Sequence, residues 1–199
     1  MQRPQTTRFY RRRLPHGRVA DRSYFVTFRL HGTLPASLRR EAENHRAVCQ
    51  QCDDELSRRF HRLMFRRIET VLDRPDPSVD FLAYPNIAGL VKEAFNWTES
   101  HCGWRVPAFA ILPNHVHALF AAGPVCTRDL SRTLGSIKGY TAYEANCILK
   151  RRGRCFWQHE SFDHWCRSAE QEEGIERYIR QNPVKAGLVT RWEDWPWVK

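Results

Sequence analysis

The stretch Pro113-Asn114-His115-Val116-His117-Ala118-Leu119-Phe120 carries two histidines, separated by one residue, within a run of mostly apolar side chains. This composition predicts a β-strand, in which successive side chains point to opposite faces of the sheet. His115 and His117 therefore share one face, while Val116 points to the other. Two neighbouring imidazoles form half of a site for a divalent metal, although such a pair can also simply face solvent.

The segments around this strand predict alternating strands and helices. Aromatic and β-branched residues indicate strands, and Pro107 indicates that the strand containing it lies at an edge or carries a bulge. Apolar residues at three- and four-residue steps indicate helices. The predicted elements are a strand over 23–30, one long helix or two helices in line over 37–73, a helix over 85–97, a strand over 104–112, the histidine strand up to 122, a helix over 129–151, a strand or extended pair over 155–167, and a last helix over 170–182 that ends at Pro183.

This order of elements predicts the fold. It contains a β-α-β-β-α-β core, and we expect an α+β, ferredoxin-like antiparallel sheet with helices on one face. The helical segment over 37–73 is enlarged, and a C-terminal helix over 168–183 is added to the core. The length of 199 residues suits a single domain over 1–199, in which residues 1–20 form a basic N-terminal arm. No segment is long and apolar enough to predict a membrane span.

The charge and the cysteines narrow the class of protein. The sequence has 32 Lys+Arg against 22 Asp+Glu, a net charge of +10, and most of the basic excess is arginine. This balance favours nucleic acid as a partner, ahead of an anionic membrane surface, although some small basic proteins are merely soluble. Seven scattered cysteines argue against a disulfide framework and for a reducing cytoplasm. Cys49 and Cys52 form a C-x-x-C pair on an apolar helical stripe, where a packing role is expected.

A second group of polar residues lies on the last predicted helix. Tyr178 and Asn182 are four residues apart, so they share one helical face, and Ile175 and Ile179 should turn that face toward the sheet. By itself, the pattern also fits a core tyrosine and an ordinary residue near the end of a helix.

Several sequence blocks resemble a known family in the same order. The block at 112–117 resembles the histidine–hydrophobe–histidine motif of HUH single-strand endonucleases. Further blocks are similar to the REP-associated tyrosine transposases, and they lie at 136–142, 156–163, 178–189 and 193–197. The resemblance extends over roughly residues 23–197. It implies a divalent metal, Mg²⁺ or Mn²⁺, that is held by His115 and His117 with Asn182 as a third ligand, and it implies Tyr178 as the nucleophile.

The implied activity is that of a metal-dependent endonuclease and strand transferase acting on single-stranded or hairpin DNA, with REP-type palindromes as the expected target. Tyr178 would form a covalent 5′-phosphotyrosine and release a 3′-hydroxyl. Because an unperturbed tyrosine has a pKa of about 10, it is a poor nucleophile without a metal on the phosphate. The alternatives are a non-catalytic DNA-binding regulator that keeps the fold and a metal hydrolase acting on RNA. A monomer or homodimer in the cytoplasm, associated with the nucleoid, is expected.

Candidate DNA contacts come from basic and aromatic residues. Arginine can hold a phosphate through two hydrogen bonds, and an aromatic ring can stack on an unpaired base, although arginine runs are often only solvated. Trp157 could therefore stack on a base, or it could pack in the core. The resemblance adds Lys138 as a phosphate contact. The arginine candidates are Arg11, Arg12, Arg13, Arg151 and Arg152.

Overall fold

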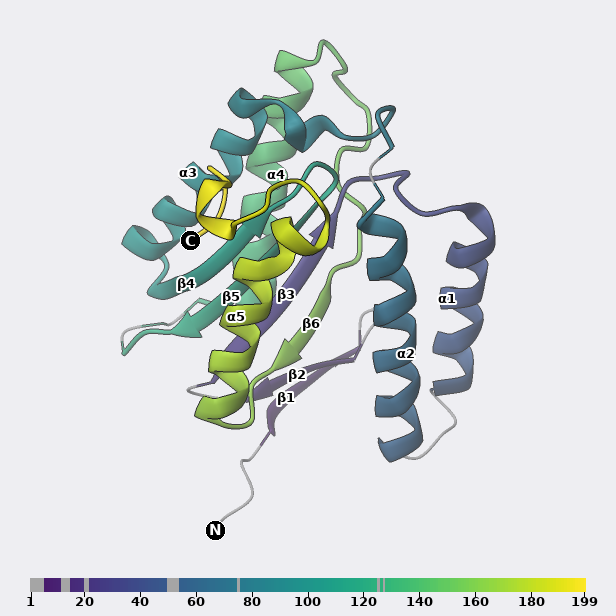
Figure 1. Ribbon diagram of the computed structural model, residues 1–199. Helices are drawn as coiled ribbons and strands as arrows, with labels where there is room; N and C mark the ends of the chain where they lie inside the picture. The colour runs from purple at the N-terminus through teal and green to yellow at the C-terminus, as the bar shows by residue number, and fades with distance from the viewer. Residues whose placement is uncertain are drawn as a thin grey trace.

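The computed structural model describes residues 6–11, 15–19, 22–49, 54–74, 76–124, 126 and 128–199, with side chains described for 22–44, 59, 61–74, 76–124, 126 and 128–199. Its centre is a four-stranded antiparallel sheet in the order β4-β5-β3-β6 (Figure 1). This order is that of a β-α-β-β-α-β fold, which confirms the predicted ferredoxin-like class. The strands are β3 (Ser23–Arg29), β4 (Trp104–Ile111), β5 (His115–Ala122) and β6 (Phe162–Trp165).

Helices cover both faces of the sheet. On one face lie α3 (Pro85–His101) and α4 (Leu130–Ile148), the two helices of the predicted core. On the other face lies α5 (Ala169–Lys185), in front of the sheet in Figure 1. Helix α2 (Asp54–Leu72) flanks that face and packs Phe65 into the same apolar cluster. Among the described residues, no helix is long and apolar enough to cross a lipid bilayer.

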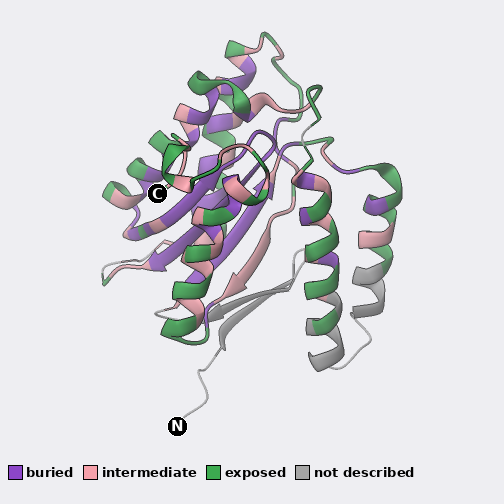
Figure 2. Ribbon diagram, in the orientation of Figure 1, coloured by how far each residue is buried: buried purple, intermediate pink, exposed green. Residues whose placement is uncertain are grey.

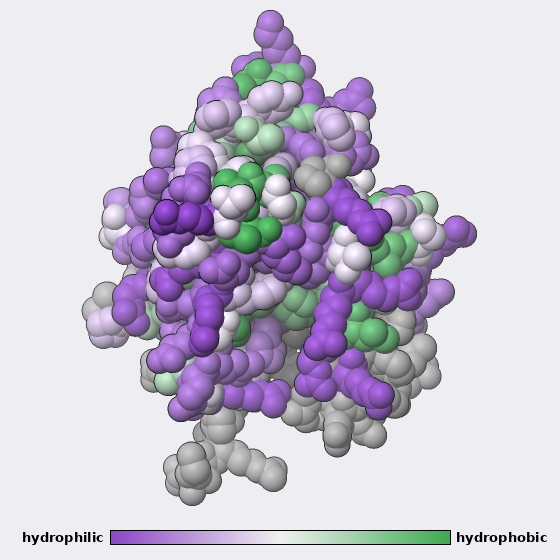
Figure 3. All heavy atoms as spheres, in the orientation of Figure 1, coloured by the Kyte–Doolittle hydropathy of each residue, from purple (hydrophilic) through white to green (hydrophobic). Residues whose placement is uncertain are grey.

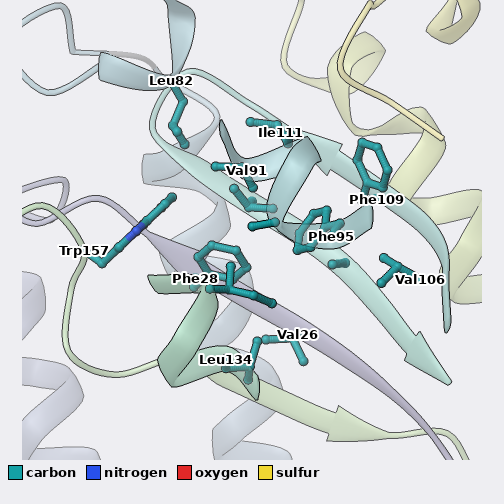
Figure 4. Close-up of a cluster of buried hydrophobic side chains, with 14 of the residues drawn as sticks. Val26, Phe28, Leu82, Val91, Phe95, Val106, Phe109, Ile111, Leu134 and Trp157 are labelled. Atoms are coloured by element: carbon teal, nitrogen blue, oxygen red, sulfur yellow. The ribbon is translucent and has the colours of Figure 1, made fainter. Parts of the chain in front are cut away.

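Alternation along the strands builds the main core. Val26 and Phe28 of β3 point toward α3, where they meet Phe95 and the other buried side chains shown in Figure 4. The central strands β3 and β5 are buried along nearly their whole length, whereas β6 is only half-buried (Figure 2). The intervening residues of β3 and β5 therefore point toward α5, and this second face carries the histidines.

The edge strand β4 contains the predicted bulge. Its register against β5 shifts between Arg105 and Ala108, on either side of Pro107. Because the bulge between Arg105 and Ala108 adds one residue, Val106 and Phe109 point to the same apolar cluster despite their odd spacing. Proline is tolerated here because β4 is an edge strand and needs fewer backbone donors.

The N-terminal half of the chain differs from the sequence prediction. Residues 37–73 do not form one helix or two in line, because α1 (Ala36–Cys49) and α2 fold back on one another. The reason is apolar burial, since Leu38 of α1 packs in one buried cluster with Met64 and Leu72 of α2. Cys52 and the side chain of Cys49 lie outside the described residues.

Three further boundaries also differ. Residues 1–20, expected as an arm, contain a hairpin of β1 (Thr6–Arg11) and β2 (Pro15–Val19). Strand β6 is much shorter than 155–167. Helix α5 continues past Pro183, because a proline in the last turn removes only one backbone hydrogen bond. Short 3₁₀ turns, η1 (Phe81–Ala83) and η2 (Trp192–Asp194), complete the structure.

Candidate functional site

The two histidines lie together on the α5 face of β5. Both are fully buried, so the solvent-facing alternative is wrong. The Nε2 atoms of His115 and His117 are 3.1 Å apart, which confirms that the side chains converge. Their burial next to each other needs a chemical reason, because buried polar atoms are normally paired.

Hydrogen bonds at the other ring nitrogens fix the orientation of both imidazoles. The Nδ1 atom of His115 lies 2.7 Å from Oδ1 of Asn114, whose Nδ2 donates to the Leu72 carbonyl oxygen. Because that bond assigns Oδ1 as the acceptor, His115 carries its proton on Nδ1 and presents an unprotonated Nε2. Nδ1 of His117 lies 2.7 Å from Oγ1 of Thr27. Such outer partners are typical of histidines that bind metals.

Burial also keeps His115 uncharged. Burial, aided by the charge of His117, lowers the pKa of His115 to about 3. A neutral imidazole is the form that can donate a lone pair to a metal.

A third residue of this cluster, Glu69, was missed in the sequence. It reaches the histidines from α2 and is only 3 % exposed, with Oε2 lying 3.1 Å from Nε2 of His117. Burial alone would raise the pKa of Glu69, but the charge of His117 and its hydrogen bond to the carboxylate outweigh burial and lower the pKa to about 2. A detectable signal existed, because Glu69 lies four residues after Phe65 and three before Leu72, on the apolar stripe of the helix.

The three side chains fit a divalent cation. One ligand atom from each of Glu69, His115 and His117 lies within 4.8 Å of the other two. Two imidazole nitrogens 3.1 Å apart have the spacing of ligands that share one ion at roughly 2.1 Å. The Oε1 atom of Glu69 is buried without a hydrogen-bond partner, which a bound cation would satisfy. Two nitrogens and a carboxylate suit manganese or zinc, and oxygen ligands from DNA would also suit magnesium.

Tyr178 contacts this cluster from α5. Its hydroxyl donates a hydrogen bond of 2.5 Å to Oε2 of Glu69, and its ring centroid lies 5.6 Å from that of His117. Burial and the negative charge of Glu69 raise the pKa of Tyr178 above its usual value. The phenol is therefore protonated at neutral pH, and its hydrogen bond to Glu69 holds it next to the cluster of Glu69, His115 and His117.

Asn182 lies one helical turn beyond Tyr178 and is fully buried. Neither its Oδ1 nor its Nδ2 atom has a hydrogen-bond partner. Ile179, between the two residues, packs against Phe25 and Leu119 of the sheet, which confirms the predicted orientation of the helix. The structure thus brings a buried, unsatisfied carboxamide to the same side of α5 as the tyrosine.

Two of the candidate DNA contacts, Trp157 and Lys138, make internal hydrogen bonds. Trp157 is 7 % exposed and donates through Nε1 to Oγ1 of Thr141, so its core-packing alternative is correct and its ring is not available to a base. Lys138 donates to the carbonyl oxygens of Gln158 and His159 at 2.6 and 2.9 Å. Its ammonium group therefore links α4 to the segment before β6 in this structure and does not point out toward a phosphate. The motif could not reveal these internal partners, because they are set by tertiary packing.

Two of the arginine candidates for DNA contact, Arg151 and Arg152, have described side chains. The Arg151 guanidinium lies 4.3 Å from the ring centroid of Phe81, and Arg152 is exposed. Arg12 and Arg13 lie outside the described residues, and Arg11 belongs to β1 but its side chain is not described.

The fold and the site define a class of protein: a ferredoxin-like α+β domain in which two histidines of the sheet and a glutamate of α2 form a buried cluster in contact with a helical tyrosine. Comparison with known protein families identifies the family to which this domain belongs. Residues 81–182, just over half of the chain, match the family described as "Transposase IS200 like". The chain belongs to this family.

Two relatives extend the comparison. The "REP-associated tyrosine transposase" of Escherichia coli (strain K12) is 30% identical over 93 residues, which are 47% of this chain and 52% of the relative. The match thus spans about half the length of that relative. The solved structure described as the REP-associated tyrosine transposase bound to a REP hairpin superposes with a TM-score of 0.56 at 18% identity, covering 89% of this chain and 76% of that one. The second likeness supports the fold.

Proposed function

We propose that this protein is a metal-dependent endonuclease and strand transferase that acts on single-stranded or hairpin DNA through Tyr178. REP-type palindromes are the proposed target. The observation that carries the proposal is the Tyr178 hydroxyl, held by a 2.5 Å hydrogen bond at the buried cluster of Glu69, His115 and His117. Membership of the IS200-like transposase family and the net charge of +10 support a DNA substrate.

In this proposal, His115 and His117 hold the metal through Nε2, and Glu69 supplies the carboxylate. Asn182 remains a proposed further ligand, because its buried carboxamide otherwise has no partner. Mg²⁺ or Mn²⁺ bound there would polarise the scissile phosphate and favour ionisation of the nearby phenol.

Tyr178 supplies the nucleophile. Its oxygen forms a bond to phosphorus while the bond from phosphorus to the 3′-oxygen breaks, leaving a 5′-phosphotyrosine and a 3′-hydroxyl. The bond energy is retained, so a 3′-hydroxyl can attack the phosphotyrosine and rejoin strands. Until substrate arrives, Glu69 keeps the Tyr178 hydroxyl protonated and in position.

A covalent trapping experiment tests the proposal. The protein is incubated with end-labelled hairpin DNA and Mn²⁺, and the products are separated under denaturing conditions. We expect an adduct that requires Mn²⁺ and is lost in Tyr178→Phe. Tyr140→Phe is the matched control, because Tyr140 is 47% exposed on α4, the helix that covers the opposite face of the sheet. DNA binding without an adduct would overturn the catalytic proposal and favour the non-catalytic regulator.

A further inference from the structure

A lysine of α5 lies beside the candidate nucleophile. Lys185 follows Tyr178 by seven residues, or about two helical turns, so the two side chains share a face. The Lys185 Nζ atom is 5.7 Å from the centroid of the Tyr178 ring. Burial is the main cause of the low pKa of His115, and the Lys185 charge acts in the same direction. The ammonium group therefore lies beside the candidate nucleophile.

Asp73 holds this lysine at the edge of the site. The Nζ atom of Lys185 lies 2.8 Å from Oδ2 of Asp73, the residue that follows α2. The side chain of Lys185 is 47% exposed, and that of Asp73 is 16% exposed. Such partly exposed pairs contribute little to stability, so separating Lys185 from Asp73 costs little free energy. The pair joins α2, which carries Glu69, to α5, which carries Tyr178.

A positive group besides a metal would stabilise a DNA phosphate at this site. Each phosphodiester carries one negative charge, and attack by an oxygen builds up further negative charge on the phosphoryl and leaving oxygens. Glu69 and Asp73 would repel that charge. Among the residues that the structure describes, Lys185 is the one whose cation lies over the Tyr178 ring. The surrounding surface over α2 and α5 is largely hydrophilic (Figure 3), as suits the approach of a polar strand.

We propose that Lys185 leaves Asp73 when DNA enters, and that it then binds the scissile phosphate as a catalytic residue. The proposal rests on the proposed function. Lys185 stabilises charge on a non-bridging oxygen and transfers no proton. The Tyr178 oxygen bonds to phosphorus, the 3′-oxygen leaves with the electron pair of its bond, water accepts the phenolic proton, and water protonates the 3′-oxygen.

Single-turnover adduct formation at saturating hairpin DNA and Mn²⁺ tests the role of the charge. We expect Lys185→Gln to slow the reaction about 100-fold, the effect typical of removing one group that stabilises transition-state charge. Lys185→Arg should retain most of the rate, and Mn²⁺ binding measured by calorimetry should be unchanged in both variants. Lys199→Gln is the matched control, because Lys199 is also 47% exposed and pairs with Glu99 at 3.2 Å.

A double-mutant cycle tests the exchange between Asp73 and phosphate. We expect Asp73→Asn to tighten DNA binding in the parent protein but not in the Lys185→Gln background, since the gain comes from releasing the lysine. An equal gain in both backgrounds would overturn the exchange. Normal rates for Lys185→Gln, with a wild-type adduct present, would overturn this inference alone. Absence of any wild-type adduct would overturn the proposed function as well.

Discussion

Replacing Asn182 by leucine is expected to stabilise the protein in metal-free buffer. The Asn182 side chain is fully buried, and neither of its polar atoms has a partner. A buried polar group without a hydrogen bond costs about 1–3 kcal/mol, and leucine keeps the branched outline and the number of side-chain heavy atoms of asparagine without that cost. Asn182→Leu should therefore raise the free energy of unfolding by about 1–3 kcal/mol, with a rise in Tm of roughly 2–4 °C for each kcal/mol.

Asn114→Leu is the matched control with the opposite sign. Asn114 is also buried, at 2% exposure, but its side chain pairs with Nδ1 of His115 and donates to the Leu72 carbonyl oxygen. The substitution leaves both of those groups without a partner, which destabilises the protein by about 1–3 kcal/mol for each group.

Urea unfolding with a chelator present measures both variants. The titration is then repeated with Mn²⁺, which should stabilise the wild-type protein by about 2.7 kcal/mol at a concentration of 100 times Kd. Asn182→Leu should gain less from Mn²⁺, because a proposed ligand is gone. If metal-free Asn182→Leu were less stable than the wild-type protein, the carboxamide would have a structural partner and the reasoning would be wrong.

Three further outcomes are expected. Tyr178→Phe removes a hydrogen bond to a buried carboxylate, so calorimetry should show a loss of about 1.5–3 kcal/mol in stability, whereas an unchanged protein would mean that the bond to Glu69 does not persist in solution. Thr27→Val removes the partner of Nδ1 of His117 and should weaken Mn²⁺ binding about 10–100-fold by titration calorimetry, with unchanged affinity arguing against a metal at that ring. Burial, together with the charge of Asp76, raises the pKa of Asp80 to about 6, so ionisation of Asp80 destabilises the fold as pH rises through 6. Asp80→Asn should consequently be more stable than the wild-type protein at pH 7 but not at pH 4, and an equal difference at both values would show that the Asp80 charge is not involved.

Local patterns in the sequence identified much of the site. The two-residue period of a strand placed His115 and His117 on one face, and the helical period placed Tyr178 and Asn182 on another. Pro107 correctly indicated the bulge, because the steric and hydrogen-bonding demands of proline act at the position itself. These features depend on neighbours only a few residues away.

Long-range contacts explain what the sequence did not reveal. Glu69 lies 48 positions before His117, and it reaches that residue only because α2 lies beside the face of the sheet that carries the histidines. Likewise, the internal partners of Lys138 and Trp157 depend on how α4 packs against the segment before β6. A sequence motif identifies candidate residues, but the direction of their side chains depends on tertiary packing.

Identifying the residue that carries DNA is the most direct test of the proposed chemistry. The trapped complex is digested with a protease that cleaves after glutamate, which can release residues 177–193 with Tyr178 as the sole tyrosine of that peptide. Mass spectrometry should find a 5′-phosphonucleotide on Tyr178, and the released strand should carry an extendable 3′-hydroxyl. A nucleotide attached to another peptide, or cleavage that leaves a 3′-phosphate, would mean that Tyr178 is not the nucleophile.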